Sequence, residues 1–87
     1  MTSIPDRPHL SRLFRMQWEA AQNNYVLLYP EGMVKLNQSA AEILKRCDGE
    51  HSVPAIVDEL ETAFNASDLQ ADVDEFLRTA SAHGWLG

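Results

Sequence analysis

The chain has 87 residues, of which 45% are hydrophobic, and its formal net charge is −6. The length fits one small domain, and the ordinary apolar content argues against disorder of the whole chain. The charge is uneven, because residues 1–47 carry six basic and four acidic side chains, whereas residues 48–87 carry one basic and nine acidic side chains. An acidic half of this kind repels phosphate backbones, so nucleic acid is a poor partner.

Membrane insertion and secretion also find no support in the sequence. No apolar run approaches the ~18 residues that a membrane-spanning helix needs. Residues 1–14 lack the apolar core of a secretory signal. The single cysteine, Cys47, excludes an internal disulfide framework and fits a reducing compartment. We therefore expect a cytoplasmic protein with no membrane segment.

The first part of the chain predicts an arm and a strand. Residues 1–10 contain two prolines and no periodicity, so we expect a flexible arm ahead of one domain that spans residues 11–87. Between residues 12 and 18 the apolar side chains Phe14, Met16 and Trp18 fall on alternate positions. A period of two predicts a half-buried strand.

The next stretch, residues 25–29, is apolar at every position. In a strand, Val26 and Leu28 would point to one face, and Tyr25, Leu27 and Tyr29 to the other. A strand that is apolar on both faces is usually covered on both. We expect one face to meet the helices, and we expect Tyr25, Leu27 and Tyr29 to form a face for a partner protein or a second copy of this chain.

A turn and three helices complete the predicted fold. Residues 29–32, Tyr-Pro-Glu-Gly, fit a type I turn that leads back into a third antiparallel strand. Asn37 or Ser39 is a good N-cap for a first amphipathic helix, and Ser52 is a good N-cap for a second. Ser67, with a glutamine three residues later, predicts a capping box at the start of a third helix. The predicted fold class is therefore α+β and winged-helix-like, with a three-stranded antiparallel sheet followed by three helices.

The residues that could perform chemistry do not form a recognisable site. Cys47, His9, His51 and His83 lack the short local spacings of zinc sites. Cys47 lies on the apolar stripe of the first helix, which favours a core role. We expect no catalytic residues, no metal and no cofactor, and hence no enzyme. An acyl carrier would need Asp-Ser-Leu at a helix start, whereas residues 67–69 read Ser-Asp-Leu.

Three segments of the chain carry a family resemblance: LLYPEGMVKLNQSAAEIL with the CDG that follows it, DVDEFL at residues 72–77, and GWL at residues 84–86. Together they resemble the PqqD family, the small proteins of pyrroloquinoline quinone biosynthesis. The resemblance covers roughly residues 11–87. It implies a peptide chaperone that binds a ribosomal precursor peptide and presents it to a radical S-adenosylmethionine (SAM) enzyme, which crosslinks a glutamate and a tyrosine in that peptide.

The resemblance also implies where the peptide binds. In the family the peptide adds as a strand to the third strand, beside the third helix, which is the general mode of strand addition. Carried onto this chain, the residues implied are Met33, Val34, Lys35, Leu36 and Asn37 on the strand edge, and Asp72, Glu75, Phe76 and Thr79 on the helix.

Two other functions stay open at this stage. The domain could recognise the leader of another modified peptide, since the same fold serves in other such pathways. A winged-helix DNA regulator fits less well, because the third helix carries one arginine against four acidic residues. The sequence is compatible with a monomer or a homodimer.

Overall fold

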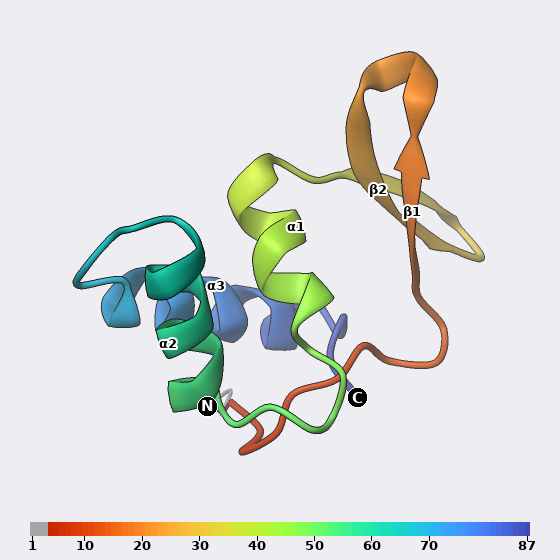
Figure 1. The fold of residues 1–87 in the computed structure, drawn as a ribbon. Helices are drawn as coiled ribbons and strands as arrows, with labels where there is room; N and C mark the ends of the chain where they lie inside the picture. The colour runs from red at the N-terminus through yellow and green to blue at the C-terminus, as the bar shows by residue number, and fades with distance from the viewer. Residues whose placement is uncertain (1–3) are drawn as a thin grey trace.

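The computed structural model describes residues 4–87 and has the α+β order that the sequence predicts. The elements are β1 (Arg15–Glu19), the short 3-10 helix η1 (Ala20–Gln22), β2 (Asn24–Tyr29), β3 (Gly32–Lys35), α1 (Gln38–Lys45), α2 (Val53–Ala63) and α3 (Gln70–Ala82). The sheet lies to one side of α1, and the hairpin of β1 and β2 projects beyond the helices (Figure 1).

The sheet is an antiparallel meander with the order β1-β2-β3, as predicted. Tyr29 pairs with Gly32, so β2 and β3 are joined by a two-residue turn. Pro30, Glu31 and Gly32 all avoid positive φ, which agrees with a type I turn. The glycine leaves room for the Tyr29 ring, since an added Cβ at Gly32 would lie 3.4 Å from the tyrosine oxygen. β3 ends the sheet and has one strand neighbour within residues 4–87.

The sheet face that we expected to meet a partner is in fact the face that meets the helices. Leu27 is fully buried in the main core, and it lies opposite Met16 of β1 and Val34 of β3. Tyr25 packs against the same core and has the Lys45 ammonium of α1 over its ring, 4.6 Å from the centroid.

Tyr29, the third residue of that face, packs against Phe14, with 5.3 Å between ring centroids. The prediction that Leu27 belongs to a partner face is therefore wrong, whereas Tyr25 and Tyr29 are only partly buried. The strand is apolar on both sides, so its alternation could not indicate which side would turn inward.

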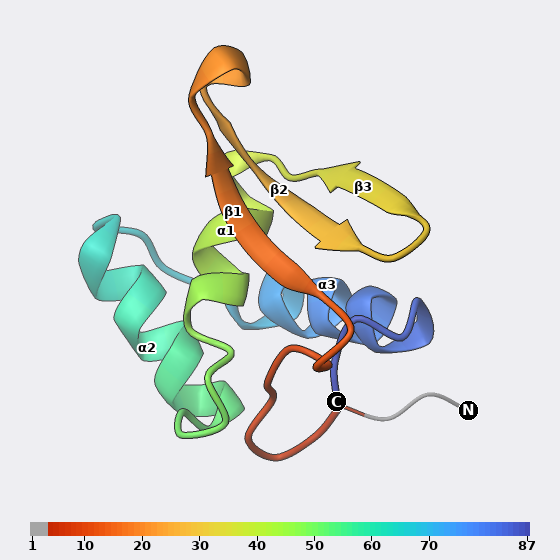
Figure 2. The ribbon, with the colours of Figure 1, turned by 90° about the vertical axis from the view of Figure 1, so that its right-hand side faces the viewer.

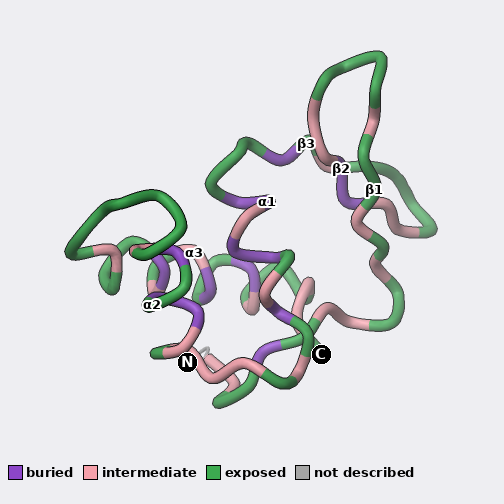
Figure 3. Tube along the Cα trace, viewed as in Figure 1, coloured by how far each residue is buried: buried purple, intermediate pink, exposed green. Residues whose placement is uncertain are grey.

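The helices bury the side chains that their spacing indicates. The core contains residues from all three helices and Cys47, which follows α1 (Ala40, Ala41, Ile43, Leu44, Cys47, Ile56, Val57, Leu60, Val73, Leu77 and Ala80), all less than 9% exposed. Figure 3 shows the buried positions on the inner sides of the helices and the sheet. Phe64, which directly follows α2, departs from this pattern because it is 46% exposed.

The helix starts confirm two of the three predicted caps. The Asn37 side chain accepts a hydrogen bond from the Ala40 N–H at 2.7 Å, and the Ser52 side chain accepts from the Ala55 N–H at 3.2 Å. The capping box at Ser67 is wrong, because α3 begins at Gln70 without a side-chain cap. A carboxylate from α2, Glu61, instead accepts a hydrogen bond from the Leu69 N–H at 3.0 Å.

The predicted arm at residues 1–10 does not extend away from the domain over its described part. Pro8 is fully buried, and its carbonyl accepts a hydrogen bond from the Gly49 N–H at 3.0 Å. On the other side, the His9 carbonyl accepts from the Gly87 N–H at 2.8 Å. This segment therefore lies between the α1–α2 connection and the C-terminal tail (Figure 2). Residues 1–3 of the predicted arm lie outside the described residues.

Candidate functional site

The open edge of β3 is the first half of the candidate site. The Leu36 N–H donates to the Tyr25 carbonyl at 3.0 Å, which makes Tyr25 and Leu36 a hydrogen-bonded pair. Hydrogen-bonded and non-hydrogen-bonded pairs alternate along an antiparallel ladder. Val34, two residues before Leu36, therefore also bonds to β2, whereas the backbone groups of Met33 and Lys35 point away from β2. The free edge thus offers the N–H and C=O groups of Met33 and Lys35.

The five residues implied for the edge play different parts in the structure. Met33 is 45% exposed and Lys35 is also exposed. Val34 is partly buried against the core, and Leu36 is buried at 2% exposure. The Asn37 side chain already caps α1. Only Met33 and Lys35 therefore combine an exposed side chain with backbone groups that are free for a further strand.

The second half of the site is one face of α3. Asp72, Glu75, Phe76 and Thr79 recur at spacings of three and four residues and so share a helix face. The face is exposed except at Phe76, which packs against the core and lies 6.4 Å from the Trp85 ring, centroid to centroid. In the view of Figure 2, β3 lies above α3, with β2 drawn between them.

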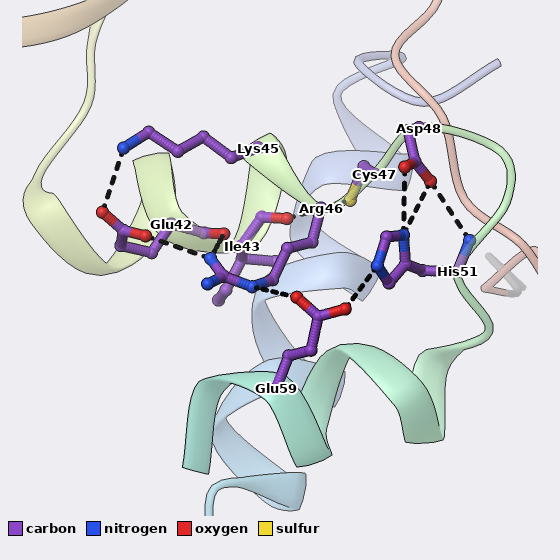
Figure 4. A network of polar contacts seen from close by, with 8 residues as sticks. All are labelled: Glu42, Ile43, Lys45, Arg46, Cys47, Asp48, His51 and Glu59. Carbon is purple, nitrogen blue, oxygen red and sulfur yellow. Dashed lines mark hydrogen bonds and ion pairs between the residues drawn. The ribbon is translucent and has the colours of Figure 1, made fainter. Parts of the chain in front are cut away.

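A network of ion pairs joins α1, the segment that follows it and α2 (Figure 4). Arg46 donates to Glu42 at 3.0 Å and to Glu59 of α2 at 3.1 Å. His51 lies between Asp48, at 2.9 Å, and Glu59. The hydrogen bond between His51 and Asp48 is the main reason that the pKa of Asp48 is lowered to about 2. The same hydrogen bond is the main reason that the pKa of His51 is raised. Each charge is matched by a neighbour, as expected of a structural link between α1 and α2.

Cys47 has no features of a nucleophile. It is 5% exposed, and its thiol donates to the Ile43 carbonyl at 3.3 Å. Burial, with a smaller effect of Asp48, raises the pKa of Cys47 to about 12, so the thiolate is not accessible near neutral pH. Among residues 4–87, no group of three or more His, Cys, Asp or Glu side chains is arranged to hold a metal ion.

A hollow of about 280 Å³ adjoins the site, and the sequence did not indicate it. It is formed where the starts of α1 and α3 meet the end of α2. Its lining residues are Gln38, Ser39, Glu42, Ile43, Leu60, Phe64, Ala66, Leu69, Asp72 and Val73. Asp72 belongs both to this hollow and to the α3 face described above. Phe64 is the large apolar residue of this lining that the fold leaves exposed, and the sequence alone carries no signal of that exposure.

The chain is similar to known proteins over most of its length. The family model described as "Coenzyme PQQ synthesis protein D (PqqD)" matches residues 24–86. A PqqA binding protein of Azotobacter vinelandii is 55% identical over 86 residues, which cover 98% of this chain and 94% of that protein. A PqqA binding protein of Methylococcus capsulatus is 54% identical over 77 residues, covering 88% of this chain and 83% of that protein.

A solved structure has the same fold. The solution NMR structure of the PqqD truncation of Methylobacterium extorquens PqqCD superposes with a TM-score of 0.81 and 28% sequence identity, and covers 99% of this chain and 96% of that one. That protein is described as a functional and stand-alone recognition element for ribosomally synthesised and post-translationally modified peptides (RiPPs).

The fold, the free edge of β3 and these similarities define a small recognition domain of the winged-helix-like class. Within that class, the chain belongs to the PqqD family of coenzyme PQQ synthesis. In the described part of the chain, no helix is long and apolar enough to cross a membrane.

Proposed function

We propose that this protein is the peptide chaperone of PQQ biosynthesis, which binds the precursor peptide PqqA by strand addition to β3. The observation that carries the proposal is the free edge, where the backbone groups of Met33 and Lys35 have no strand partner in residues 4–87. An added strand would gain backbone hydrogen bonds there. The relatives at about half identity are PqqA binding proteins, which supports PqqA as the peptide.

The α3 face gives the site its selectivity in this proposal. Asp72 and Glu75 are exposed carboxylates, and Phe76 adds an apolar surface between them and the core. A bound segment with an apolar residue and a nearby lysine or arginine would match this face. Because exposed charges are screened by salt, we expect the affinity to fall as the salt concentration rises.

The direct test is an NMR titration of the isotope-labelled protein with full-length PqqA. Saturable shifts concentrated at residues 33–37 and along the exposed face of α3 would support the proposal. No shifts at high peptide excess, with the protein folded, would refute it. Tighter binding of the leader from a different modified-peptide pathway would instead favour the alternative function, recognition of another modified peptide.

Replacement of Lys35 by proline tests whether the backbone of the β3 edge binds the peptide. Lys35→Pro removes an N–H that points away from β2, and proline is tolerated on edge strands at such positions. We expect the fold to persist and the affinity for PqqA to fall about tenfold, since one peptide carbonyl loses its donor. The control, Lys35→Ala, keeps the N–H and should bind much as the unchanged protein does. Equal affinities for both variants would contradict strand addition here.

We further propose that the bound peptide is presented to a radical SAM enzyme, and that this takes place in the cytoplasm. Strand addition uses backbone groups in the plane of the sheet, so the exposed side chains of Met33 and Lys35 stay accessible for an enzyme. The free, buried thiol of Cys47 suits a reducing compartment. Sedimentation of protein, PqqA and the enzyme together should give one ternary complex, and competition between enzyme and peptide would contradict presentation.

A further inference from the structure

The hollow between α1, α2 and α3 contains no residue of the strand edge, but it shares Asp72 with the α3 face of the site. Gln38 and Ser39, on one of its walls, directly follow Asn37, where the chain leaves the edge strand. Asp72, on the opposite side, belongs to the α3 face that forms the second half of the candidate site. A peptide that runs along β3 toward the start of α1 would therefore arrive at this hollow.

The size and lining of the hollow suit a side chain rather than a cofactor. A volume of about 280 Å³ is below the ~300–1,000 Å³ of typical small-molecule pockets. The apolar side chains Ile43, Leu60, Leu69 and Val73 line it, and they are buried or partly buried in the core. Such a surface fits one bulky aliphatic or aromatic side chain.

The α2–α3 loop holds an apolar side chain at this hollow although the loop itself faces solvent. Residues 62–68 are exposed throughout (Figure 3), and Phe64 among them is 46% exposed. Asn65 and Asp68 have positive φ values of 50° and 60°, a conformation that costs free energy in residues other than glycine. The hydrogen bond from the Leu69 N–H to Glu61 holds the end of this loop.

The charged residues at the rim of the hollow favour a particular type of residue next to the bound apolar side chain. Glu42 is already paired with Lys45 at 3.1 Å and with Arg46 at 3.0 Å. Asp72 is exposed and has no ion-pair partner within residues 4–87. The free carboxylate of Asp72 therefore favours a lysine or arginine close to the apolar residue of the occupant.

We propose that this hollow is a second anchor for the precursor peptide, which takes one bulky apolar side chain from the part of the peptide that lies beyond the segment paired with β3. The proposal rests on the proposed function, since it assigns the same peptide to a further site. The hollow and the edge would then bind adjacent parts of one chain, so the affinity of the whole peptide exceeds that of the edge segment alone.

Filling the hollow from either wall tests the anchor. Ala66→Trp and Ser39→Trp each place a large ring at an exposed lining position on opposite sides, so neither requires a change in the core. We expect each variant to bind PqqA about 10–100-fold more weakly, the range that burial of one large apolar side chain supplies. The control is Ala71→Trp, an exposed alanine of α3 outside the lining, which should leave the affinity unchanged.

A scan of the peptide completes the experiment. Each apolar residue of PqqA is replaced by alanine, and the affinity is measured by calorimetry for the unchanged protein and for Ala66→Trp. One replacement should weaken binding to the unchanged protein and have little effect on Ala66→Trp, because the two changes remove the same contact.

The outcomes separate the anchor from the proposed function. If PqqA binds the unchanged protein, Ala66→Trp, Ser39→Trp and Ala71→Trp equally well, the anchor is refuted and the chaperone role stands. If PqqA does not bind the unchanged protein, both proposals are refuted.

Discussion

At the scale of single residues, His51 links two elements through its charge. Both ring nitrogens face carboxylate oxygens, those of Asp48 and Glu59, and a carboxylate can only accept a hydrogen bond. Both nitrogens must therefore carry hydrogen to satisfy the two contacts, which favours the imidazolium form. The pKa of His51 is raised for this reason, chiefly by the hydrogen bond to Asp48.

The raised pKa of His51 predicts a pH dependence of stability. A group whose pKa is raised on folding contributes its full stabilisation below its ordinary pKa, which is 6.5 for His51. This stabilisation is lost as the pH rises through the raised pKa of the folded protein. The protein should therefore unfold at a higher temperature at pH 6 than at pH 8. Thermal unfolding followed by circular dichroism at both values tests this, and His51→Gln should reduce the difference.

The control for that prediction is His83→Gln. His83 stacks on Trp85, with 5.2 Å between ring centroids, and lies outside the network of Figure 4. This variant should keep the pH dependence of the unchanged protein. An unaltered pH dependence in His51→Gln would show that the His51 contacts do not contribute to the pH dependence of stability.

At lower pH, the stabilisation that Asp48 contributes should be lost as the pH falls below its ordinary pKa of 3.8 toward about 2.

At the scale of elements, the junction of β3 and α1 depends on one side chain. Asn37 follows the free edge, and its side-chain oxygen accepts the hydrogen bond from the Ala40 N–H that starts α1. We expect Asn37→Ala to lower the free energy of unfolding by about 1 kcal/mol, the typical loss for a helix cap. Urea unfolding measures this change. Asn37→Ser keeps an acceptor and should lose much less, and equal losses would contradict the capping role.

The same junction explains why the edge of β3 stays free. Leu36 is buried and its N–H bonds to β2, so the chain is held to the sheet up to the point where α1 begins. The backbone groups of Met33 and Lys35 then point away from β2. An exposed edge of this kind invites pairing with another chain, and short edge strands with lysine are a common protection against aggregation. β3 has only four residues and carries Lys35.

At the scale of the whole molecule, the N-terminal segment closes the fold. Pro8 is buried, and the backbone of residues 8–11 bonds to Gly49 on one side and to the tail at Trp85 and Gly87 on the other. These contacts join parts of the chain that are far apart in sequence. The segment therefore contributes to the stability of the domain, although its sequence resembles a loose arm.

Truncation tests the contribution of this segment. Removal of residues 1–10 exposes the surface that Pro8 and Leu10 cover and removes the hydrogen bonds of Gly49 and Gly87, so we expect a loss of about 2 kcal/mol or more in the free energy of unfolding. Removal of residues 1–3 takes away none of these contacts and serves as the control. If both truncations unfold at the same urea concentration, the segment is not part of the stable domain.

The sequence by itself determined the type and order of the elements, because hydrophobic period, turn residues and caps are local signals. The meander, its turn at residues 29–32 and the caps at Asn37 and Ser52 follow from these signals. The same signals carry no information on which of two apolar faces turns inward, so the orientation of β2 was predicted wrongly.

Only the tertiary structure decided the features that depend on contacts between distant segments. Leu27 is buried because α1, β1 and β3 meet on its side. At the start of α3, the Leu69 N–H bonds to Glu61 of α2 and not to a local cap. The hollow at Phe64 likewise exists only where three helix ends meet. These contacts form at long sequence separation, where the gain in packing must exceed the entropy of ordering the chain between them.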